Sequence, residues 1–334
     1  MNILHLARRD ASPHFTQPAF QEAMRTLGDF ELRESAEDLS QAEVLARIRD
    51  ADVLLTGHGT LPIPEELAVY PGRLQYICHL TGTLQGMVPP ALVESGLLIS
   101  NWGDAPANEL AEASLTLLLT LLKEIPRHLR HNQDGLWWEA MPDASPGQLF
   151  GLTVGLYGYG FSGKALHRLL RPFRVRVRVY DPFVDDIPED AERVDSLAAL
   201  FDGAHAVSIH AGLTPETRGS VTRDLLARLP DGGILINTAR GALVDQNALF
   251  AELETGRLRA GLDVLDGKDD LPPDHPARHW PNLVLTRHKL TRTGWPDTRT
   301  LTPAHRVCLD NLRRFRDGQP IRFRINAERL SLTT

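Results

Sequence analysis

The first hundred residues alternate short apolar runs with longer stretches in which apolar positions recur at helical spacing. Each apolar run is bounded by turn residues and has the length of a buried strand, which predicts strands at residues 3–6, 52–56, 75–80 and 97–100. The stretches between them predict helices at residues 18–27, 41–49 and 64–69. Because strands that alternate with helices favour a parallel sheet covered on both faces, we expect a small α/β domain here.

A long apolar helix follows at residues 107–125, and we expect Pro126 to end it because proline cannot continue the helical hydrogen-bond ladder. After Ser145 the alternation resumes and predicts six strands, at residues 153–157, 176–180, 206–210, 233–237, 259–263 and 282–286. Residues 300–315 predict a final helix. A chain of 334 residues exceeds what one core usually supports, so we expect an α/β protein with two Rossmann-like, doubly wound parallel-sheet domains.

Composition and charge exclude several classes of partner. The chain has 36 Lys and Arg against 43 Asp and Glu, and this net charge of -7 disfavours binding to nucleic acid. Cys78 and Cys308 form no CxxC motif or Cys/His cluster, so we expect reduced thiols and no metal site. The most apolar segment, residues 113–122, is shorter than the roughly 20 residues that cross a bilayer, and no export signal is visible. We therefore expect a cytoplasmic protein without membrane contact.

The strand predicted at residues 153–157 runs into a glycine-rich turn that opens a helix. The first glycine permits a tight turn, the second lets the backbone approach a pyrophosphate, and the third allows the helix to pack closely on the strand. The amide groups and dipole at the helix N-terminus attract phosphate. This context predicts a dinucleotide site that includes Gly158, Gly160, Phe161, Ser162 and Gly163.

The next predicted strand ends at Asp181, an acidic residue at a position that selects the cofactor. Its carboxylate can accept hydrogen bonds from both hydroxyls of a ribose and repels a 2'-phosphate, which favours NAD over NADP. Arg174, Arg176 and Arg178 could instead bind that phosphate, although their alternation with valines is typical of solvent-facing side chains on one strand. NADP therefore stays the less favoured alternative.

Candidate catalytic side chains follow the ends of later predicted strands. The segments concerned contain His210, then Thr238, Ala239 and Arg240, then Asp263, and finally His288. The planar guanidinium of Arg240 can form a fork onto a carboxylate and polarise the adjacent carbonyl. His288 can give a proton to a carbonyl oxygen or remove it from a hydroxyl, because imidazole titrates near neutral pH.

Together with the glycine turn, these segments resemble, in order and spacing, the D-isomer-specific 2-hydroxyacid dehydrogenases over nearly the whole chain. The resemblance implies a NAD-binding domain at residues 103–288, inserted into a substrate domain made of residues 1–102 and 289–334. It also implies a homodimer whose interface includes the helix near residues 107–125. The activity it implies is hydride transfer between NAD(H) and a small anionic 2-hydroxy or 2-keto acid. Arg240 and His288 are then catalytic, and the resemblance places around the cofactor His210, Thr238, Ala239 and Asp263.

The chain departs from the family at the carboxylate that pairs with the histidine. The family has a glutamate shortly after the position of Asp263, where it stabilises the imidazolium and so raises the pKa of the histidine. Counting forward from Asp263 gives Lys268, whereas counting back from Leu271 gives Asp269. Asp269 would preserve the pair with a shorter side chain, and Lys268 would weaken the acid. We hypothesise that Asp269 is the third catalytic residue.

Two further departures concern prolines, because Gly212 and Arg287 stand where the family commonly has that residue. These changes lie near the cofactor and catalytic loops. They leave open an atypical substrate or a loss of turnover.

A segment of the first domain resembles the family's substrate loop, in which small residues let successive backbone amides bind a carboxylate. The residues expected to bind substrate are Thr81, Gly82 and Thr83, together with Arg240 and His288. His58 lies after the preceding strand and is expected to face the same cleft. Lys289 and Arg292 add positive charge, which favours an acidic or phosphorylated substrate.

Two other functions stay open from the sequence. A nucleotide-sensing protein or scaffold that keeps the fold with little turnover would account for Lys268. Oxidation of a phosphonate-type substrate would use the same scaffold. The presence of both Arg240 and His288 favours the dehydrogenase.

Overall fold

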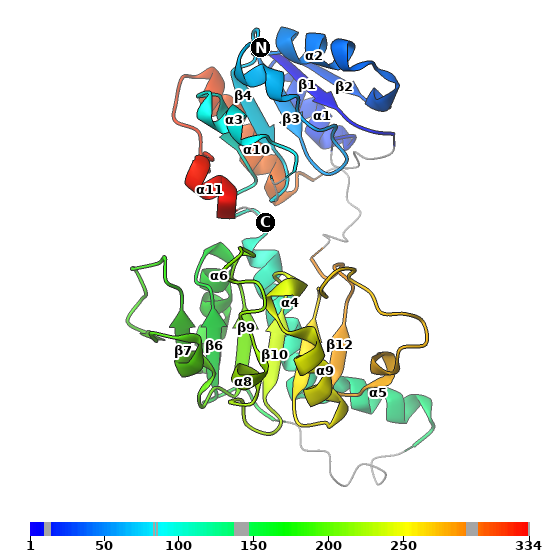
Figure 1. Ribbon diagram of the computed structural model, residues 1–334, viewed down its shortest axis with the longest axis vertical. Helices are drawn as coiled ribbons and strands as arrows, with labels where there is room; N and C mark the ends of the chain where they lie inside the picture. The colour runs from blue at the N-terminus through cyan, green and yellow to red at the C-terminus, as the bar shows by residue number, and fades with distance from the viewer. Residues whose placement is uncertain (10–14, 83, 85, 137–146, 292–299, 333–334) are drawn as a thin grey trace. The chain divides into compact units, whose positions relative to one another are not determined.

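The computed structural model describes residues 1–9, 15–82, 84, 86–136, 147–291 and 300–332, which fall into two units (Figure 1). Unit 1 comprises Met1–Pro106 and Thr293–Thr334, and unit 2 comprises Ala107–Arg292. Unit 2 is therefore an insertion in the chain of unit 1. Both changes of unit lie a few residues beyond positions 102 and 288, where the sequence had suggested them.

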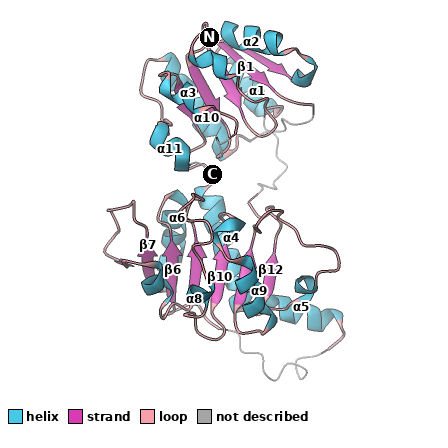
Figure 2. Ribbon diagram, in the orientation of Figure 1, coloured by secondary structure: helices cyan, strands magenta, loops and turns pink. Residues whose placement is uncertain are grey.

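The described strands of unit 1, magenta in Figure 2, form one parallel sheet. Their order in the sheet is β2-β1-β3-β4-β5. Their bounds are Asn2–Leu6 (β1), Asp29–Arg33 (β2), Val53–Thr56 (β3), Tyr76–His79 (β4) and Leu98–Ser100 (β5). One face is covered by α1 (Pro18–Arg25) and α10 (Pro303–Arg316), whose apolar residues share a core with β1, β3 and β4. The other face is covered by α2 (Gln41–Asp50), α3 (Pro90–Glu94) and α11 (Ala327–Leu332).

The described strands of unit 2 form a second parallel sheet, in the order β12-β11-β10-β9-β6-β7-β8. Their bounds are Thr153–Tyr157 (β6), Arg176–Tyr180 (β7), Ala191–Arg193 (β8), Ala206–Ile209 (β9), Ile234–Asn237 (β10), Arg259–Leu262 (β11) and Leu283–Leu285 (β12). Helices α4 (Ala107–Leu122) and α6 (Phe161–Leu170) cover one face. The other face carries α7 (Leu197–Phe201), α8 (Arg223–Leu226) and α9 (Gln246–Glu254).

The strand order of unit 2 indicates where along the sheet a ligand crevice is expected. The chain runs outward from β6 to β7 in one direction and from β9 to β10 in the other, so the order reverses between the neighbours β6 and β9. At such a reversal the loops after adjacent strands leave toward opposite faces of the sheet, and a crevice opens at their carboxyl ends. The glycine turn follows β6, and His210 follows β9.

Both sheets contain an edge strand that the sequence pattern did not predict. In β2 and β8 most side chains are half-buried or exposed, as expected for strands with one free edge. The segment Ala191–Arg193 reads Ala-Glu-Arg and has no apolar run to detect. The expectation of six strands in unit 2 is therefore wrong by one, as the described residues contain seven.

The helices differ from expectation at several points. The segment expected to be a helix at residues 64–69 is a 3₁₀ turn, and the short helices α3 and α11 were missed. The other described 3₁₀ turns are Ala36–Asp38, Arg171–Phe173, Gly241–Leu243 and Pro276–His279. Within the described part of the chain, no helix combines the length and apolar character that a bilayer crossing requires.

The helix expected at residues 107–125 does not end at Pro126. Helix α4 ends at Leu122, and Glu124, with a left-handed φ of 52°, separates it from α5 (Ile125–Gln133). Pro126 lies in the first turn of α5, where a missing N–H costs nothing because that donor has no partner inside the helix. Proline therefore starts a second helix here.

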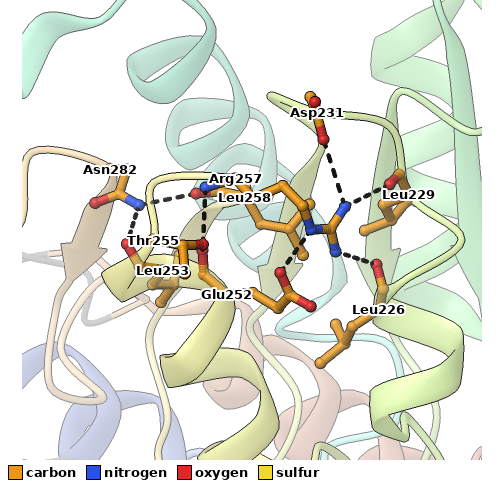
Figure 3. Close-up of polar contacts among 9 residues, drawn as sticks. All are labelled: Leu226, Leu229, Asp231, Glu252, Leu253, Thr255, Arg257, Leu258 and Asn282. Atoms are coloured by element: carbon orange, nitrogen blue, oxygen red, sulfur yellow. Dashed lines mark hydrogen bonds and ion pairs between the residues drawn. The ribbon is translucent and has the colours of Figure 1, made fainter.

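A network around Arg257 fixes the turn that leads from α9 into β11 (Figure 3). Its guanidinium donates to the Leu226 and Leu229 carbonyls at 2.9 and 2.8 Å and to Glu252 at 2.6 Å. Asn282, just before β12, donates to the Leu253 and Leu258 carbonyls at 2.8 Å each. These contacts tie α8, α9, β11 and β12 together, and they position the strands whose ends carry Asp263 and His288.

Candidate active site

Of the three glycines in the turn after β6, only Gly160 has open space beside its Cα. Gly158 has a φ of +93°, and a Cβ there would lie 2.6 Å from the Ala211 amide nitrogen. A Cβ on Gly163 would lie 2.4 Å from the Gly158 carbonyl oxygen. A Cβ on Gly160 would meet no atom within 4 Å, and Gly160 directly precedes the first turn of α6. The turn therefore leaves an open cradle at a helix N-terminus, which fits a dinucleotide pyrophosphate.

Asp181 lies at the end of β7, beside this cradle. One carboxylate oxygen accepts a hydrogen bond from the Tyr159 amide at 2.7 Å, and the other accepts from the Phe183 amide at 2.8 Å. A fixed carboxylate at this position suits ribose hydroxyls and disfavours a phosphate.

The arginines near this strand end point to different partners. Arg178 pairs with Glu192 at 3.1 Å and donates to the Asp202 carbonyl at 2.7 Å, while Arg176 is exposed. Arg193, which sequence reasoning missed, donates to the carbonyls of Asp181 and Val184. Arg193 thus contacts the backbone of Asp181, and it is the arginine that could bind a 2'-phosphate in the NADP alternative. Its position on the unpredicted strand β8 explains why no pattern revealed it.

The ends of β9 and β10 are polar and well ordered by local hydrogen bonds. His210 Nε2 lies 2.9 Å from the Ser208 hydroxyl, and burial lowers the pKa of His210 from 6.5 to about 4. The Thr238 hydroxyl lies 2.9 Å from that of Ser114 on α4, and the Ala239 amide donates to Asn237 at 3.0 Å. These contacts hold a neutral imidazole and a short turn next to the glycine cradle.

Arg240 follows directly on this turn. The Asn237 side chain donates to the Arg240 carbonyl at 2.9 Å, and the guanidinium donates to the Ala239 carbonyl at 2.8 Å. A Cβ on Gly241 would lie 1.9 Å from the Leu265 carbonyl carbon, so the turn lies tightly against the backbone of Leu265 and Asp266. Burial lowers the pKa of Arg240, and the nearby carboxylate of Asp269 offsets part of this shift.

His288 contacts Asp269, not Lys268. The imidazole Nδ1 lies 2.7 Å from an Asp269 carboxylate oxygen, and the other oxygen accepts from the Leu265 amide at 2.9 Å. Lys268 is exposed. Because the Asp269 carboxylate contacts Nδ1, Nε2 on the other side of the ring points away from Asp269. The His288 side chain is 51% exposed. Arg240, Asp269 and His288 therefore belong to one neighbourhood of unit 2.

Asp263 organises the turn that carries His288. Its buried carboxylate accepts from the Thr286 hydroxyl at 2.5 Å and from the Lys289 and Leu290 amides at 3.1 and 3.2 Å. Its carbonyl accepts from the His288 amide at 2.5 Å. Through these hydrogen bonds Asp263 stabilises the turn after β12. A contact between Asp263 and the nicotinamide stays a proposal.

Sequence reasoning also missed Asp270, the neighbour of Asp269. Asp270 pairs with Arg287 at 2.8 Å and with Arg278 at 2.7 Å. Two successive carboxylates thus hold two successive residues, Arg287 and His288. The only signal in the sequence was the placement of acidic residues side by side before Leu271.

In unit 1, Thr81 and Gly82 follow β4, and Thr83 lies outside the described residues. The Thr81 side chain is 3% exposed, and its hydroxyl contacts Nε2 of buried His79, whose Nδ1 lies 2.8 Å from the Thr56 hydroxyl. A Cβ on Gly82 would lie 2.9 Å from the Trp102 indole nitrogen. The Thr81 hydroxyl therefore faces the interior, and a contact between its backbone and a substrate stays a prediction. His58 is exposed, and Arg292 lies outside the described residues.

Comparisons with known proteins show which family this chain resembles. Residues 115–289 match the family model described as D-isomer specific 2-hydroxyacid dehydrogenase, NAD binding domain. A D-3-phosphoglycerate dehydrogenase of Methanocaldococcus jannaschii is 29% identical over 278 residues, 82% of this chain and 52% of that protein. A hydroxypyruvate reductase of Thermotoga maritima is 29% identical over 281 residues, 82% of this chain and 90% of that protein. The match thus spans about half of the first relative and most of the second.

Solved structures show the same fold. Acyclic imino acid reductase Bsp5, in complex with NADPH and D-Arg, matches with a TM-score of 0.77 at 21% identity, and the match covers 97% of this chain and 99% of that one. At this identity the likeness concerns the fold alone.

Proposed function

This chain belongs to the D-isomer specific 2-hydroxyacid dehydrogenase family and has its NAD(P)-binding domain, and on that premise we propose that it reversibly reduces a small anionic 2-keto acid to a 2-hydroxy acid. The observation that carries the proposal is the Asp269–His288 contact of 2.7 Å in the same neighbourhood as Arg240. It combines a proton carrier, a carboxylate that stabilises its charged form and a guanidinium for an anion.

Each of these side chains has a definite task in the proposed reaction. The Arg240 guanidinium binds the substrate carboxylate and polarises the neighbouring carbonyl. His288, held by Asp269 at Nδ1, delivers a proton from Nε2 to the carbonyl oxygen during reduction and takes it back during oxidation. A nicotinamide dinucleotide, when bound, supplies the hydride to C2 or accepts it. We assign the anion-binding backbone of unit 1 to Thr81 and Gly82, with Thr83 as expected from the sequence.

We propose NAD as the preferred cofactor. The residues assigned to it are the glycine turn with Phe161 and Ser162, the strand-end residues His210, Thr238 and Ala239, and Asp181 and Asp263. Both oxygens of Asp181 are held by backbone amides, which keeps a negative charge where a 2'-phosphate would lie. Arg193 is the observation that supports NADP, the less favoured alternative.

The alternative of a sensor or scaffold with little turnover loses its main support, because exposed Lys268 does not occupy the position beside His288. Oxidation of a phosphonate-type substrate at the same residues is a separate alternative. It predicts reduction of NAD in the absence of any 2-hydroxy acid.

The test is a screen for NADH and NADPH oxidation with glyoxylate, hydroxypyruvate, pyruvate and phosphorylated keto acids. We expect at least one keto acid to support turnover, and Arg240→Ala to lower kcat/KM by at least about 100-fold because it removes a forked, charge-assisted contact. The matched control is Arg228→Ala, an exposed arginine of unit 2 that pairs with Asp202. Binding of NADH without turnover of any keto acid, or full activity in Arg240→Ala, would contradict the proposal.

A further inference from the structure

The side chain of Tyr159 lies inside unit 2, although the residue stands between the two turn glycines. It is 2% exposed and belongs to the core formed by α4, α6 and the sheet. Burial raises the pKa of its hydroxyl, which therefore stays protonated and needs a hydrogen-bond partner. That partner is Nδ1 of His167 on α6, at 2.6 Å.

His167 receives this hydrogen bond as a neutral ring. It is 2% exposed, and burial lowers its pKa, with Arg171 acting in the same direction and Asp190 in the opposite one. A neutral imidazole that accepts a hydrogen bond from the Tyr159 hydroxyl at Nδ1 carries its own proton on Nε2. Nε2 lies 3.6 Å from Asp190, which Arg171 holds with two contacts at 2.7 and 3.2 Å.

The backbone of Tyr159 has a second partner on the ribose side of the cradle. Its amide donates to the Asp181 carboxylate at 2.7 Å. One residue therefore binds the carboxylate at the end of β7 through its amide and the phosphate-binding helix α6 through its hydroxyl. Asp190, at the far end of the loop that starts at Asp181, closes the network on His167.

We propose that Tyr159 and His167 are positioning residues for the dinucleotide, which hold the glycine cradle and Asp181 in register with α6. The inference rests on the proposed function, because it takes the cradle and Asp181 as the cofactor site. Neither side chain is required to touch the cofactor. Without the Tyr159–His167 bond the turn can shift relative to the helix, and the open space at Gly160 no longer faces the α6 amides.

The test is a fluorescence titration of the full chain with NADH, with NADPH in parallel. Tyr159→Phe removes only the hydroxyl, and we expect it to raise the NADH Kd about five- to tenfold, the factor typical of one hydrogen bond. His167→Leu should have the same effect. His167→Asn should restore binding to within about twofold of wild type, because an Asn side-chain oxygen can accept from Tyr159 near the place of Nδ1.

A matched control separates positioning from general destabilisation. Tyr157 lies two positions earlier, and its hydroxyl lies 3.0 Å from that of Ser220 in the core of the opposite face. Tyr157→Phe also removes a tyrosine hydrogen bond, and we expect it to leave the NADH Kd unchanged. Urea unfolding of each variant shows that it is folded under the titration conditions.

The outcomes distinguish this inference from the proposed function. Wild-type binding in Tyr159→Phe and His167→Leu, an equal loss in Tyr157→Phe, or no recovery in His167→Asn would each overturn the positioning role. If the wild type binds NADH but turns over no keto acid, the proposed function fails while the titration still decides the inference. A wild type that binds neither dinucleotide would overturn both.

Discussion

His288 depends on contacts that hold an unusual backbone. Arg287 and His288 have φ values of 57° and 56°, a left-handed conformation that is uncommon for residues with a Cβ. The bonds to Asp263 and the Asp270–Arg287 ion pair offset the cost of this conformation. A proline, which the family commonly has at position 287, cannot adopt a positive φ, so the chain positions its histidine by a different local arrangement.

The first prediction concerns Asp269. Asp269→Asn keeps the shape of the side chain but removes the carboxylate that holds His288 at Nδ1, so we expect kcat/KM to fall by about 10- to 100-fold. The measurement is steady-state turnover of the best keto acid. Asp266→Asn, an exposed position in the same loop, is the control. An unchanged rate in Asp269→Asn would remove Asp269 from the mechanism.

Buried His5 predicts a loss of stability in acid. Its Nδ1 lies 2.8 Å from the Leu55 carbonyl, and burial lowers its pKa from 6.5 to about 4. Between these values the unfolded chain binds more protons than the folded one. The stability contributed by neutral His5 is therefore complete above pH 6.5 and declines toward pH 4, by up to about 3 kcal/mol.

Urea unfolding between about pH 7 and pH 5 measures this slope. His5→Gln should make the decline shallower without abolishing it, because His210 contributes in the same direction. An identical slope in His5→Gln and wild type would show that His5 does not titrate as burial predicts.

At the scale of elements, the sequence predicts buried strands well and exposed edges poorly. The bounds of β6 and β7 agree with the prediction at both ends. Every residue of β6 is buried, and Val177 and Val179 are the buried residues of β7. Strand β8 has a polar sequence, and only its pairing with β7 defines it. Strand β2 alternates Phe30 and Leu32 with charged residues, a period-2 pattern and not a continuous apolar run. Pro126 was expected to end a helix but lies in the first turn of α5, because proline is favoured at helix starts as well as after helix ends. No sequence pattern marks Glu124, the left-handed residue that separates α4 from α5.

Two substitutions in the glycine turn are expected to differ in their effect on stability. Gly160→Ala adds a Cβ into open space, so we expect a normally stable protein whose NADH Kd rises at least about tenfold because the methyl group occupies the cradle. Gly163→Ala forces a Cβ against the Gly158 carbonyl, so we expect it to lose stability as well. NADH titration and urea unfolding of both variants are the measurements. Wild-type affinity in Gly160→Ala would contradict the assignment of the cradle.

For the molecule as a whole, the sequence identified the strand ends that carry the site but not the contacts between them. Counting residues could not choose between Lys268 and Asp269, because the choice depends on how the 265–271 loop folds back on His288. Asp270 and Arg193 act through partners distant in sequence, and no local pattern reveals such pairs. The loop pattern singled out Thr81 as a candidate, but it could not show that the Thr81 hydroxyl contacts His79, which in turn contacts Thr56 on the neighbouring strand β3.

We further propose that the chain is a homodimer. Helix α4 packs on its own sheet, whereas α5 buries none of its residues, and Ile125 and Leu129 are 42% and 58% exposed. Ile125 and Leu129 lie one turn apart on α5, and we propose that a second copy of the chain covers them. The interface is thus expected on α5 as well as near α4.

Light scattering tests this arrangement. We expect the wild type to have the mass of two chains and Leu129→Glu the mass of one, because the substitution buries a charge in the interface. Val69→Glu, at a 90% exposed position of unit 1, should keep the wild-type mass. A monomeric wild type, or a dimeric Leu129→Glu, would contradict the proposed interface.

We propose that His288, fixed by Asp269 beside Arg240, carries the proton in the reduction of a 2-keto acid. This role is tested by kcat/KM for keto-acid reduction in His288→Asn relative to wild type. We expect a loss of about 100- to 10,000-fold with the NADH Kd unchanged, because Asn keeps a polar side chain but cannot transfer the proton. A variant that turns over at the wild-type rate would show that the proton comes from elsewhere.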